Sequence, residues 1–465
     1  MMVSACSRAS TVCHEWDLRR RAVGRGQIVQ PESRSAARAC TNSPWRVPVS
    51  GSSVRAALLV LVVALPLAAS SRAEATGVRA KPQQGRLPLI RKPNPALDSI
   101  SCVGPETCWV IGDYGNLSTP SSPSSDNGIF ALHLKAGRWS YIRVPAPRGY
   151  VGFDGGAQGP AVSCSSDNNC WAAGGTNNYA LEGPPSHDVA IHWSGKVWRL
   201  APTPSPRSRS RNVVNDSLQS VSCPTPTMCW AVGFRDNGGQ LALELHGGRW
   251  QVGTIPSLPA ASYATLESVS CVTSRDCWAV GTAPDQTGPP GKCGLYQNER
   301  KELNYALLWN GTRWRRYPVP SGSTCTNDLG AVACASAQAC WAVGQNDDGN
   351  EAVAWNGRRW RPVSIPRAPG MDAGLVSLAC PSVRTCWGVG VNMDSPPPNG
   401  GQTIFRYSDG SWHIEPGIPR PPGNILLGLS CGGANSCWAV GYFEPKQTLR
   451  PEVVHWNGRW WSLVP

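Results

Sequence analysis

Cysteines carry the most regular chemical signal in the sequence. The 465-residue chain holds 19 Cys, and most of them form seven copies of a Cys-x5-Cys pair. Two thiols at this spacing can join as a disulfide or contribute to a metal site. Five intervening residues with no second His or Cys pair nearby are poor zinc spacing, so we predict a disulfide in each copy. The pairs are Cys102–Cys108, Cys164–Cys170, Cys223–Cys229, Cys271–Cys277, Cys334–Cys340, Cys380–Cys386 and Cys431–Cys437.

Two further cysteines, Cys293 and Cys325, lie outside this repeat. Both fall in connections that the repeat places on one face, so we expect them to pair and to pin an insertion. Cys6, Cys13 and Cys40 are left without a partner in this scheme. So many cysteines indicate an oxidising compartment.

Ionisable side chains give weaker chemical signals. A sialidase-like hydrolase needs an Arg cluster, a Tyr nucleophile with a Glu partner, and an acid around one point. Candidates exist, but their spacing does not link them: Arg235, Tyr179, Glu182 and Asp188. The sequence contains no HExxH, GxSxG or Gly-rich phosphate loop. We therefore assign no catalytic, cofactor-binding or metal residue.

One run of carboxyl and amide side chains is a candidate calcium site, because Ca²⁺ prefers oxygen ligands. It consists of Asn346, Asp347, Asp348, Asn350 and Glu351. Its core, Asp347-Asp348-Gly349, is also a good hairpin-turn sequence. Matching turns in other copies are Asp126-Asn127-Gly128 and Asp236-Asn237-Gly238. We favour the turn interpretation.

The cysteine pair belongs to a repeat of about 55 residues. In each copy an apolar strand, which contains Ser in six of the seven copies, ends in the first Cys, and Cys-Trp opens the next strand. A Gly followed two or three residues later by Trp marks a second hairpin. These pairs are Gly137/Trp139, Gly195/Trp198, Gly248/Trp250, Gly311/Trp314, Gly357/Trp360, Gly410/Trp412 and Gly458/Trp460.

Each copy has the pattern of four short strands, which is typical of a propeller blade. In the third copy these strands are Leu218–Cys223, Cys229–Gly233, Leu241–His246 and Trp250–Ile255. We predict an all-β fold, a seven-bladed β-propeller with four antiparallel strands and one disulfide per blade. It covers residues 96–465, with blades starting near residues 98, 160, 218, 266, 329, 375 and 427.

The ring can be closed in two ways. The last strand, Trp460–Val464, ends the chain, so each blade is complete in sequence order. Packing of blade seven on blade one can then close the ring. The stretch Arg86–Lys92 is a candidate for an additional outer strand.

A Trp follows the second Cys in all seven copies. Strand alternation places it on the face opposite the sulfur. We predict that it fills the wedge between adjacent blades rather than stacking on a sugar. These residues are Trp109, Trp171, Trp230, Trp278, Trp341, Trp387 and Trp438.

The repeat resembles the Asp-box class of propellers across Asp98–Pro465. The class includes sialidases and the photosystem II assembly-factor family. Three segments carry the resemblance: Ser220-Val221-Ser222-Cys223, Cys229-Trp230-Ala231-Val232-Gly233 and Trp309-Asn310-Gly311-Thr312-Arg313-Trp314. Cys replaces the family's Phe and Gly, and only Asp409 retains the acid, which is replaced by Asn at Asn310, Asn356 and Asn457. The resemblance implies the fold and no particular activity.

Long connections of variable length all emerge on one face of the predicted ring, where binding usually resides. They are Asp113–Gly128, Gly175–Asp188, Ala201–Asp216 and Thr282–Asn304. Arg207, Arg209 and Arg211 form a small basic loop among them.

The composition excludes two broad classes. At 41% hydrophobic and 16% charged residues, with 49 Gly and 42 Pro, the chain is neither disordered nor helical in type. Ten of 43 basic and four of 30 acidic residues lie in residues 1–75, so the net charge of +13 falls to about +7 for the remainder. That charge favours anionic polymers. No basic run with interleaved aromatics occurs, so we expect no nucleic-acid partner.

The first 75 residues have the character of a leader. The apolar run Ala56–Ala69 followed by Ala73-Glu74-Ala75 predicts a signal peptide at residues 54–75, and hence secretion. Residues 1–53 fit poorly with a signal peptide, which leaves two interpretations: translation starts further downstream, which we favour, or these residues are a long n-region. Residues 76–95 are a linker, and we expect no membrane anchor after cleavage.

Three functions remain open at this point. The first is a non-catalytic binding or scaffold module for a cell-wall glycan or an extracellular protein. The others are a sialidase-like glycoside hydrolase and an assembly factor for a membrane protein complex. We favour the first, as a monomer without a cofactor.

Overall fold

The computed structural model describes residues 85–115, 127–146, 160–176, 187–204, 216–235, 239–258, 264–285, 287, 293, 300–367, 375–391, 402–415, 424–444 and 448–465. The chain divides into two units, and the unit containing Gln83–Pro465 holds all of these residues. The other unit, residues 12–82, lies outside the described part, as do the predicted leader and signal peptide.

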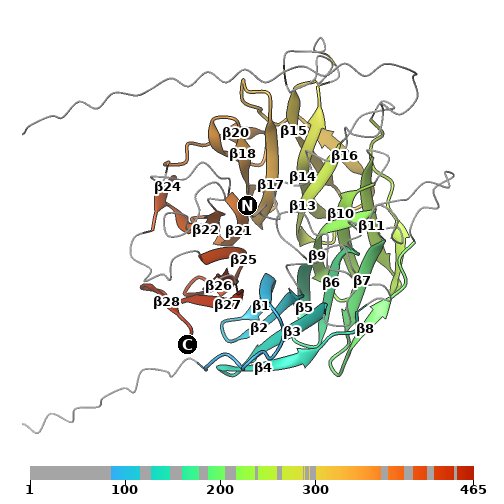
Figure 1. The fold of residues 1–465 in the computed structure, drawn as a ribbon. Coiled ribbons are helices and arrows are strands. Elements are labelled where there is room, and N and C mark those ends of the chain that lie inside the picture. Colours follow the sequence, from blue (N-terminus) through green and yellow to red (C-terminus); the bar gives the residue numbers. More distant parts are fainter. Residues whose placement is uncertain are drawn as a thin grey trace, which may run out of the picture. The chain divides into compact units, whose positions relative to one another are not determined.

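Seven four-stranded antiparallel sheets make up the described chain, each a meander in sequence order, which confirms the predicted blades (Figure 1). Blade one has β1 Ala96–Gly104, β2 Thr107–Tyr114, β3 Gly128–Lys135 and β4 Arg138–Arg143. Blade two has β5 Ala161–Ser166, β6 Asn169–Gly175, β7 Asp188–Trp193 and β8 Trp198–Ala201. Blade three has β9 Ser217–Thr225, β10 Met228–Phe234, β11 Gln240–His246 and β12 Arg249–Val252.

The remaining four blades repeat this order. Blade four has β13 Thr265–Thr273, β14 Asp276–Pro284, β15 Glu302–Trp309 and β16 Trp314–Tyr317. Blade five has β17 Asn327–Ser336, β18 Ala339–Asn346, β19 Gly349–Trp355 and β20 Trp360–Pro362. Blade six has β21 Leu375–Ser382, β22 Thr385–Val391, β23 Gln402–Ser408 and β24 Ser411–Ile414. Blade seven has β25 Asn424–Gly433, β26 Ser436–Phe443, β27 Arg450–Trp456 and β28 Trp461–Leu463.

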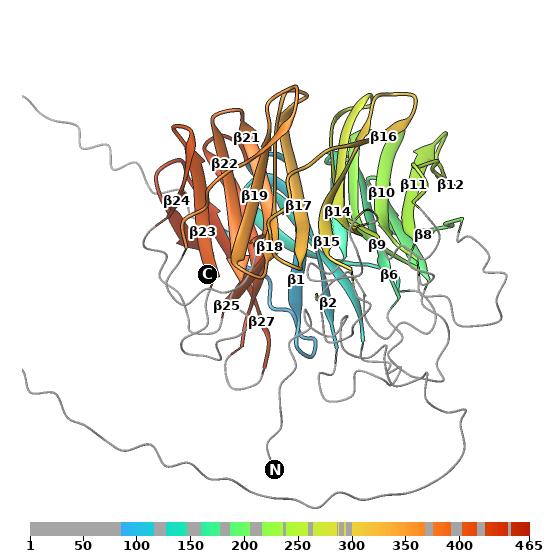
Figure 2. The same cartoon turned by 90° about the horizontal axis from the view of Figure 1, so that it is seen from above.

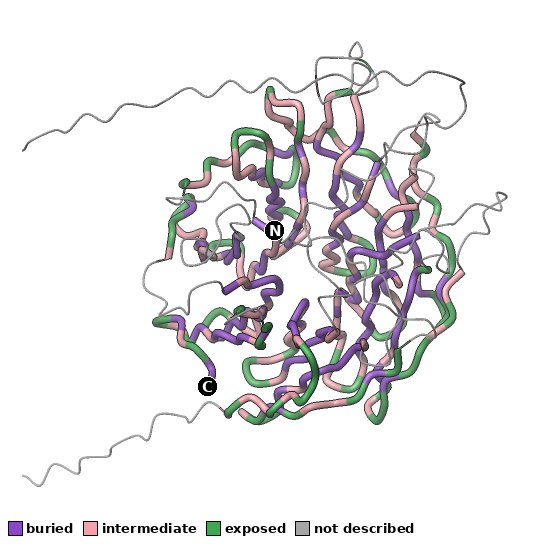
Figure 3. Tube along the Cα trace, in the orientation of Figure 1, coloured by how far each residue is buried: buried purple, intermediate pink, exposed green. Residues whose placement is uncertain are grey.

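The first strand of each blade lies innermost, and these strands contact one another in cyclic order until β25 reaches β1. The view turned by 90° shows the sheets next to one another, with the axes of their strands roughly aligned (Figure 2). Buried residues concentrate in the inner and middle strands, whereas exposed residues lie mainly on turns and outer strands (Figure 3). The apolar core is therefore a set of seven wedges between neighbouring sheets rather than one central cluster.

All seven Cys-x5-Cys pairs form disulfides between the first and second strand of a blade, as predicted. Their Cα atoms lie 3.9–4.1 Å apart. A loop this short contributes about 2 kcal/mol per disulfide by restricting the unfolded chain. Such a set of disulfides fits an oxidising compartment.

The Trp after the second Cys packs against the next blade at every junction. Trp230, for example, is 1% exposed and meets Trp314 of blade four edge-on, with ring centroids 5.0 Å apart. Six junctions contain this edge-on pair, with centroids 5.0–5.5 Å apart. The seven copied Trp thus lie in the wedges, with their rings turned away from solvent.

The sequence prediction placed the wrong Trp in the last strand. Trp461 occupies the buried position and meets Trp387 edge-on, whereas Trp460 is 52% exposed. The hairpin at Gly458 has the three-residue Gly-to-Trp spacing seen at Gly311 and Trp314. The adjacent Trp460 therefore falls in the turn.

A β-bulge in the first strand explains the glycine four residues after the second Cys. Six blades have this register shift near the start of the first strand. The shift presses a backbone carbonyl onto the second strand, and in five blades a Cβ on the glycine would lie 1.8–2.2 Å from that oxygen. Only glycine avoids the overlap, at Gly112, Gly233, Gly281, Gly344 and Gly441.

Serines of the first strand tie blades together. Ser220 and Ser222 of β9 accept hydrogen bonds from the backbone N–H groups of Val269 and Cys271 in β13, at 3.1 and 3.0 Å. Equivalent bonds occur at the junctions of blades seven and one, one and two, two and three, and four and five. The serines before the first Cys thus orient neighbouring blades on each other at five junctions.

Packing closes the ring without strand exchange. Trp438 and Val464 of blade seven share one apolar cluster with Leu97 and Phe130 of blade one. The stretch Arg86–Lys92 is not a strand, contrary to one of the two possibilities above. It still contributes, because Leu87 donates its backbone N–H to the carbonyl of Pro465 at 2.8 Å and packs on this cluster.

Candidate functional site

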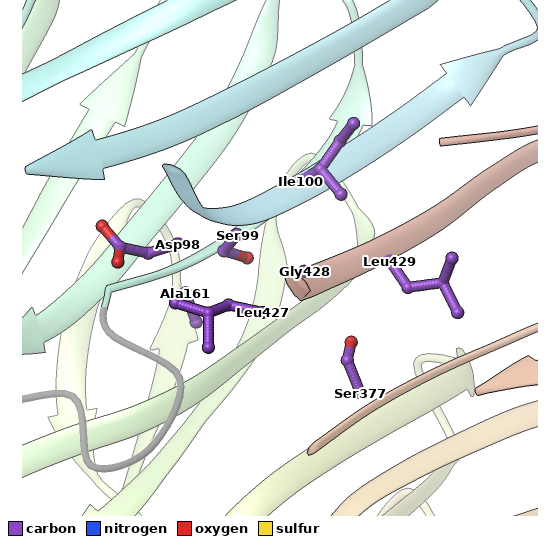
Figure 4. A pocket seen from close by; sticks show the side chains of 8 residues that line it. All are labelled: Asp98, Ser99, Ile100, Ala161, Ser377, Leu427, Gly428 and Leu429. Atoms are coloured by element: carbon purple, nitrogen blue, oxygen red, sulfur yellow. The ribbon is translucent and has the colours of Figure 1, made fainter. Parts of the chain in front are cut away.

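The innermost strands leave a small pocket near the axis (Figure 4). It is lined by parts of β1, β5, β21 and β25, including Asp98, Ser99 and Gly428. A Cβ at Gly428 would lie 2.9 Å from the Cα of Ser99, so the two backbones nearly touch there. Ser99 already accepts a hydrogen bond from Val162. The pocket is an interstice between blades that serves packing.

The meander order defines two faces. Turns between first and second strands, and between third and fourth strands, emerge on one face, and the other connections emerge on the opposite face, which we call the loop face. Most of the long connections singled out in the sequence lie outside the described residues. So do Tyr179, Glu182 and the arginines Arg207, Arg209 and Arg211.

One described part of the loop face gathers polar side chains from blades four and five. We call it the acidic corner, and it consists of Glu267, Glu302, Asn304, Asn327, Asp328 and Glu351. β13, β15, β17 and β19 supply these residues near the strand ends that open on the loop face. The corner joins two blades because β13 and β17 are neighbours in the ring.

Two buried amides form the floor of the acidic corner. Asn304, 4% exposed, donates its Nδ2–H groups to the carbonyl of Pro320 at 2.8 Å and to Oε1 of Glu351 at 2.5 Å. Asn327 is 0% exposed and donates to the carbonyls of Glu302 and Thr324 at 2.9 and 3.1 Å. Both amides therefore use their N–H groups to hold the connections of the corner in place.

Acceptor atoms are left over at the same place. The buried oxygens without a donor among the described residues include Asn304 Oδ1, Asn327 Oδ1, Asp328 Oδ1 and Glu351 Oε2. A buried polar atom without a hydrogen bond costs roughly 1–3 kcal/mol. Four such acceptors on adjacent strands mark a place that favours a donor from outside.

The electrostatics of the corner follow from its crowding. Burial raises the pKa of Asp328 well above its usual value, and the nearby carboxylates of Glu267, Glu302 and Glu351 raise it further. Burial also raises the pKa of Glu351, and the hydrogen bond from Asn304 partly offsets this rise. A positive charge placed here would favour ionisation of these carboxyl groups.

A disulfide and an aspartate brace the edge of the corner. Cys293 and Cys325 are joined, with Cα atoms 5.2 Å apart. The carbonyl of Cys325 accepts from the backbone N–H of Glu302 at 2.8 Å. Asp347 Oδ2 accepts from the N–H of Cys325 at 2.8 Å, and a hydrogen bond from Thr326 holds the pKa of Asp347 below its usual value. The insertion of blade four is thus fixed to the hairpin of blade five.

The residues considered as a calcium site make hydrogen bonds within the protein or form a turn. Asp347 and Asp348 form the turn between β18 and β19, as the favoured interpretation predicted, and Gly349 has a φ of 113°. Asn346 Oδ1 accepts from the N–H of Asp348 at 2.9 Å, while Glu351 faces Asn304. Among the described residues, no group of three or more His, Cys, Asp or Glu side chains is placed to hold a metal ion.

The two hydrolase candidates that the structure describes, Arg235 and Asp188, belong to neighbouring blades. Arg235 follows β10 of blade three, where its N–H donates to Gly239, and Asp188 begins β7 of blade two. Four third strands among the described residues contain a histidine, and three of these, His133, His192 and His455, stack on the Trp of the neighbouring strand. His246 differs, because its register partner is Met228.

Sequence reasoning did not single out Asn304, Asn327 or Asp328. A signal exists in hindsight, because a polar residue opening a buried strand recurs in blade seven. There Asn424 donates to Glu452 at 2.9 Å, and both residues are 2% exposed. Asn424 and Asn327 both open the first strand of their blade.

No family model matches the chain, and no curated protein matches it. Similar solved structures include YCF48 bound to a D1 peptide, at 12% identity over 78% of this chain and 94% of that chain, with a TM-score of 0.44. A PL25 polysaccharide lyase, an ulvan lyase, is 10% identical over 80% and 96%, with a TM-score of 0.49. The Aleuria aurantia lectin with α-methyl-L-fucoside is 11% identical over 66% and 95%, with a TM-score of 0.40. At these identities the likeness concerns the fold alone.

Proposed function

We propose that this protein is a secreted, non-catalytic binding propeller that recognises an extracellular ligand through its loop face. The ligand is a cell-wall glycan or a protein outside the cell. The ring supplies a rigid support, since a disulfide braces each blade, Trp wedges pack each blade on the next, and serine hydrogen bonds add to this packing at five junctions. Rigid supports with recognition residues at their edges lower the entropic cost of binding.

The acidic corner is the observation that carries the proposal. Four of its buried oxygens have no donor among the described residues, and its connections are held by the Cys293–Cys325 disulfide and by Asp347. Folding gains nothing from acceptors left without donors. A partner that supplies those donors gains the hydrogen bonds on binding.

Secretion is part of the proposal. The predicted signal peptide at residues 54–75 supports it, and so do the eight disulfides, which persist in oxidising surroundings. Within the described residues no helix is long and apolar enough to cross a membrane.

The test is to incubate purified protein with a panel of bacterial wall glycans, host glycans and secreted proteins, and to analyse bound and released material by mass spectrometry. Retention of an intact glycan or protein supports the proposal. Release of a shortened sugar contradicts it, because it would show that the protein cleaves its ligand. Asp328 would then be the first candidate for a general acid, since its pKa is raised. Retention of nothing on the panel contradicts it as well.

A further inference from the structure

Resting on the function proposed above, we propose that the acidic corner binds a Lys or Arg side chain of a protein partner. The site consists of Asn304 and Asn327 at its floor and of Asp328 and Glu351 beside them. Both amides are at least nine-tenths buried, and the Asn304 amide points at Glu351.

The chemistry of the missing group follows from the atoms left over. The four oxygens without donors are all acceptors. A Lys ammonium brings three donors and an Arg guanidinium five, and neither carries an acceptor that would repel these oxygens. Hydrogen bonds between a charged donor and a carboxylate are roughly twice as strong as neutral ones.

The chain's own nearby cations make hydrogen bonds to backbone carbonyls. Lys301 Nζ donates to the carbonyl of Gly322 at 2.6 Å, and Arg300 donates to the carbonyl of Asp285 at 3.1 Å. Lys301 lies close enough to lower the pKa of Glu351, which nevertheless stays raised by burial. Four buried acceptor oxygens of the corner still have no donor among the described residues.

A side chain of a protein fits the corner better than an amino sugar does. Sugar rings are commonly held against an exposed aromatic face, but Tyr305, which follows Asn304 on β15, is 1% exposed. Arg316 lies over the ring of Tyr305, at 5.2 Å from its centroid. The six described residues that make up the acidic corner include no aromatic side chain, so recognition by them depends on charge and hydrogen bonds, which a Lys or Arg side chain supplies alone.

The experiment measures binding of fluorescent hexalysine and hexaglutamate peptides to the intact protein by anisotropy. We expect hexalysine alone to bind, with an affinity that rises with pH as the corner's carboxyl groups ionise. Glu351→Gln should weaken binding by about tenfold or more, because a charge-assisted hydrogen bond is lost. Asp328→Asn is the second variant, should Glu351→Gln fail to fold. The matched control is Glu415→Gln, a half-buried glutamate of blade six whose pKa burial also raises, and it should leave affinity unchanged.

Several outcomes overturn the inference. They are equal affinity in the Glu351→Gln and wild-type proteins, tighter binding of a chitosan oligomer than of hexalysine, and a Ca²⁺ ion that raises the Tm while hexalysine does not bind. The panel of glycans and secreted proteins tests the proposed function separately. If a ligand from the glycan and protein panel is retained equally by the wild-type and Glu351→Gln proteins, the cation site is wrong and the binding function stands. If nothing is retained, both are wrong.

Discussion

The backbone N–H of Cys102 donates a hydrogen bond of 3.0 Å to Oγ of Ser430, joining the first strand of blade one to that of blade seven. The two residues are 328 positions apart in the chain. The same bond links Cys271 to Ser222 at an internal junction. Ring closure therefore uses the contact that joins successive blades, which explains why no strand has to be exchanged between the ends of the chain.

Replacing Ser430 with Ala should weaken this closure. The Cys102 N–H would lose its partner, and we expect the free energy of unfolding to fall by about 1–2 kcal/mol. Chemical denaturation of the purified protein measures the change. Ser140→Ala is the control, because that exposed hydroxyl bonds only to a carbonyl of its own blade. Equal effects of the two substitutions would contradict a special role for Ser430.

The two adjacent tryptophans near the C-terminus should behave differently. Trp461→Ala empties a wedge beside Trp387 and should cost about 3–5 kcal/mol of stability. Trp460→Ala removes an exposed side chain and should change stability by less than about 0.5 kcal/mol. Thermal unfolding of both variants checks this, and a larger loss from Trp460→Ala would show that the strand register is wrong.

Glycine at the bulge should be irreplaceable. In Gly441→Ala the new Cβ would lie 1.8 Å from the carbonyl oxygen of Ile425, so the backbone must shift, at a cost of about 1–3 kcal/mol. Gly433→Ala is the matched control in blade seven, since no atom lies within 4 Å of its Cβ position. Its effect should stay below about 1 kcal/mol. Denaturant midpoints of the two variants give the comparison, and similar losses would argue against the bulge explanation.

Acid should loosen the junction of blades seven and one. Burial lowers the pKa of His455 to about 4 from 6.5, and the ring stacks on Trp438 with centroids 3.8 Å apart. The folded state therefore binds fewer protons than the unfolded state between these values, so its stability is full above pH 6.5 and is lost as the pH falls toward 4. Melting temperatures across this range measure the slope.

The His455→Phe variant keeps a ring against Trp438 but cannot titrate, so its stability should fall less steeply between pH 6.5 and 4. His413→Phe serves as the control, because His413 is exposed on β24 and bonded to Ser411. If His455→Phe follows the wild-type slope, protonation of His455 is not the cause.

Repetition made the fold predictable. The Cys-x5-Cys pair, the Trp after it and the Gly that follows occur in copy after copy, so blade number, disulfides and wedges could all be inferred. The last strand was misplaced for the same reason: the repeat allows two Gly-to-Trp spacings, and Trp460 and Trp461 satisfy one each. Only burial distinguishes them.

The acidic corner could not be predicted in this way. Asn304, Asn327 and Glu351 lie near the starts of β15, β17 and β19, where the sequence differs between blades. They meet because β15 lies in blade four, next to the sheet that contains β17 and β19, and because the Cys293–Cys325 disulfide and Asp347 hold the intervening chain. No local sequence pattern predicts that these three residues lie close together in space. The pairing of Cys293 with Cys325 was expected, but its place beside the corner was not.

The most direct test of the account is hydrogen–deuterium exchange on the intact protein, with and without whichever wall glycan or secreted protein the panel retains. Binding through the loop face predicts slower exchange in residues 301–304, 321–328 and 346–351. It also predicts no change in the opposite turns, such as those at Asp167 and Ser274. Protection confined to those opposite turns would contradict the account.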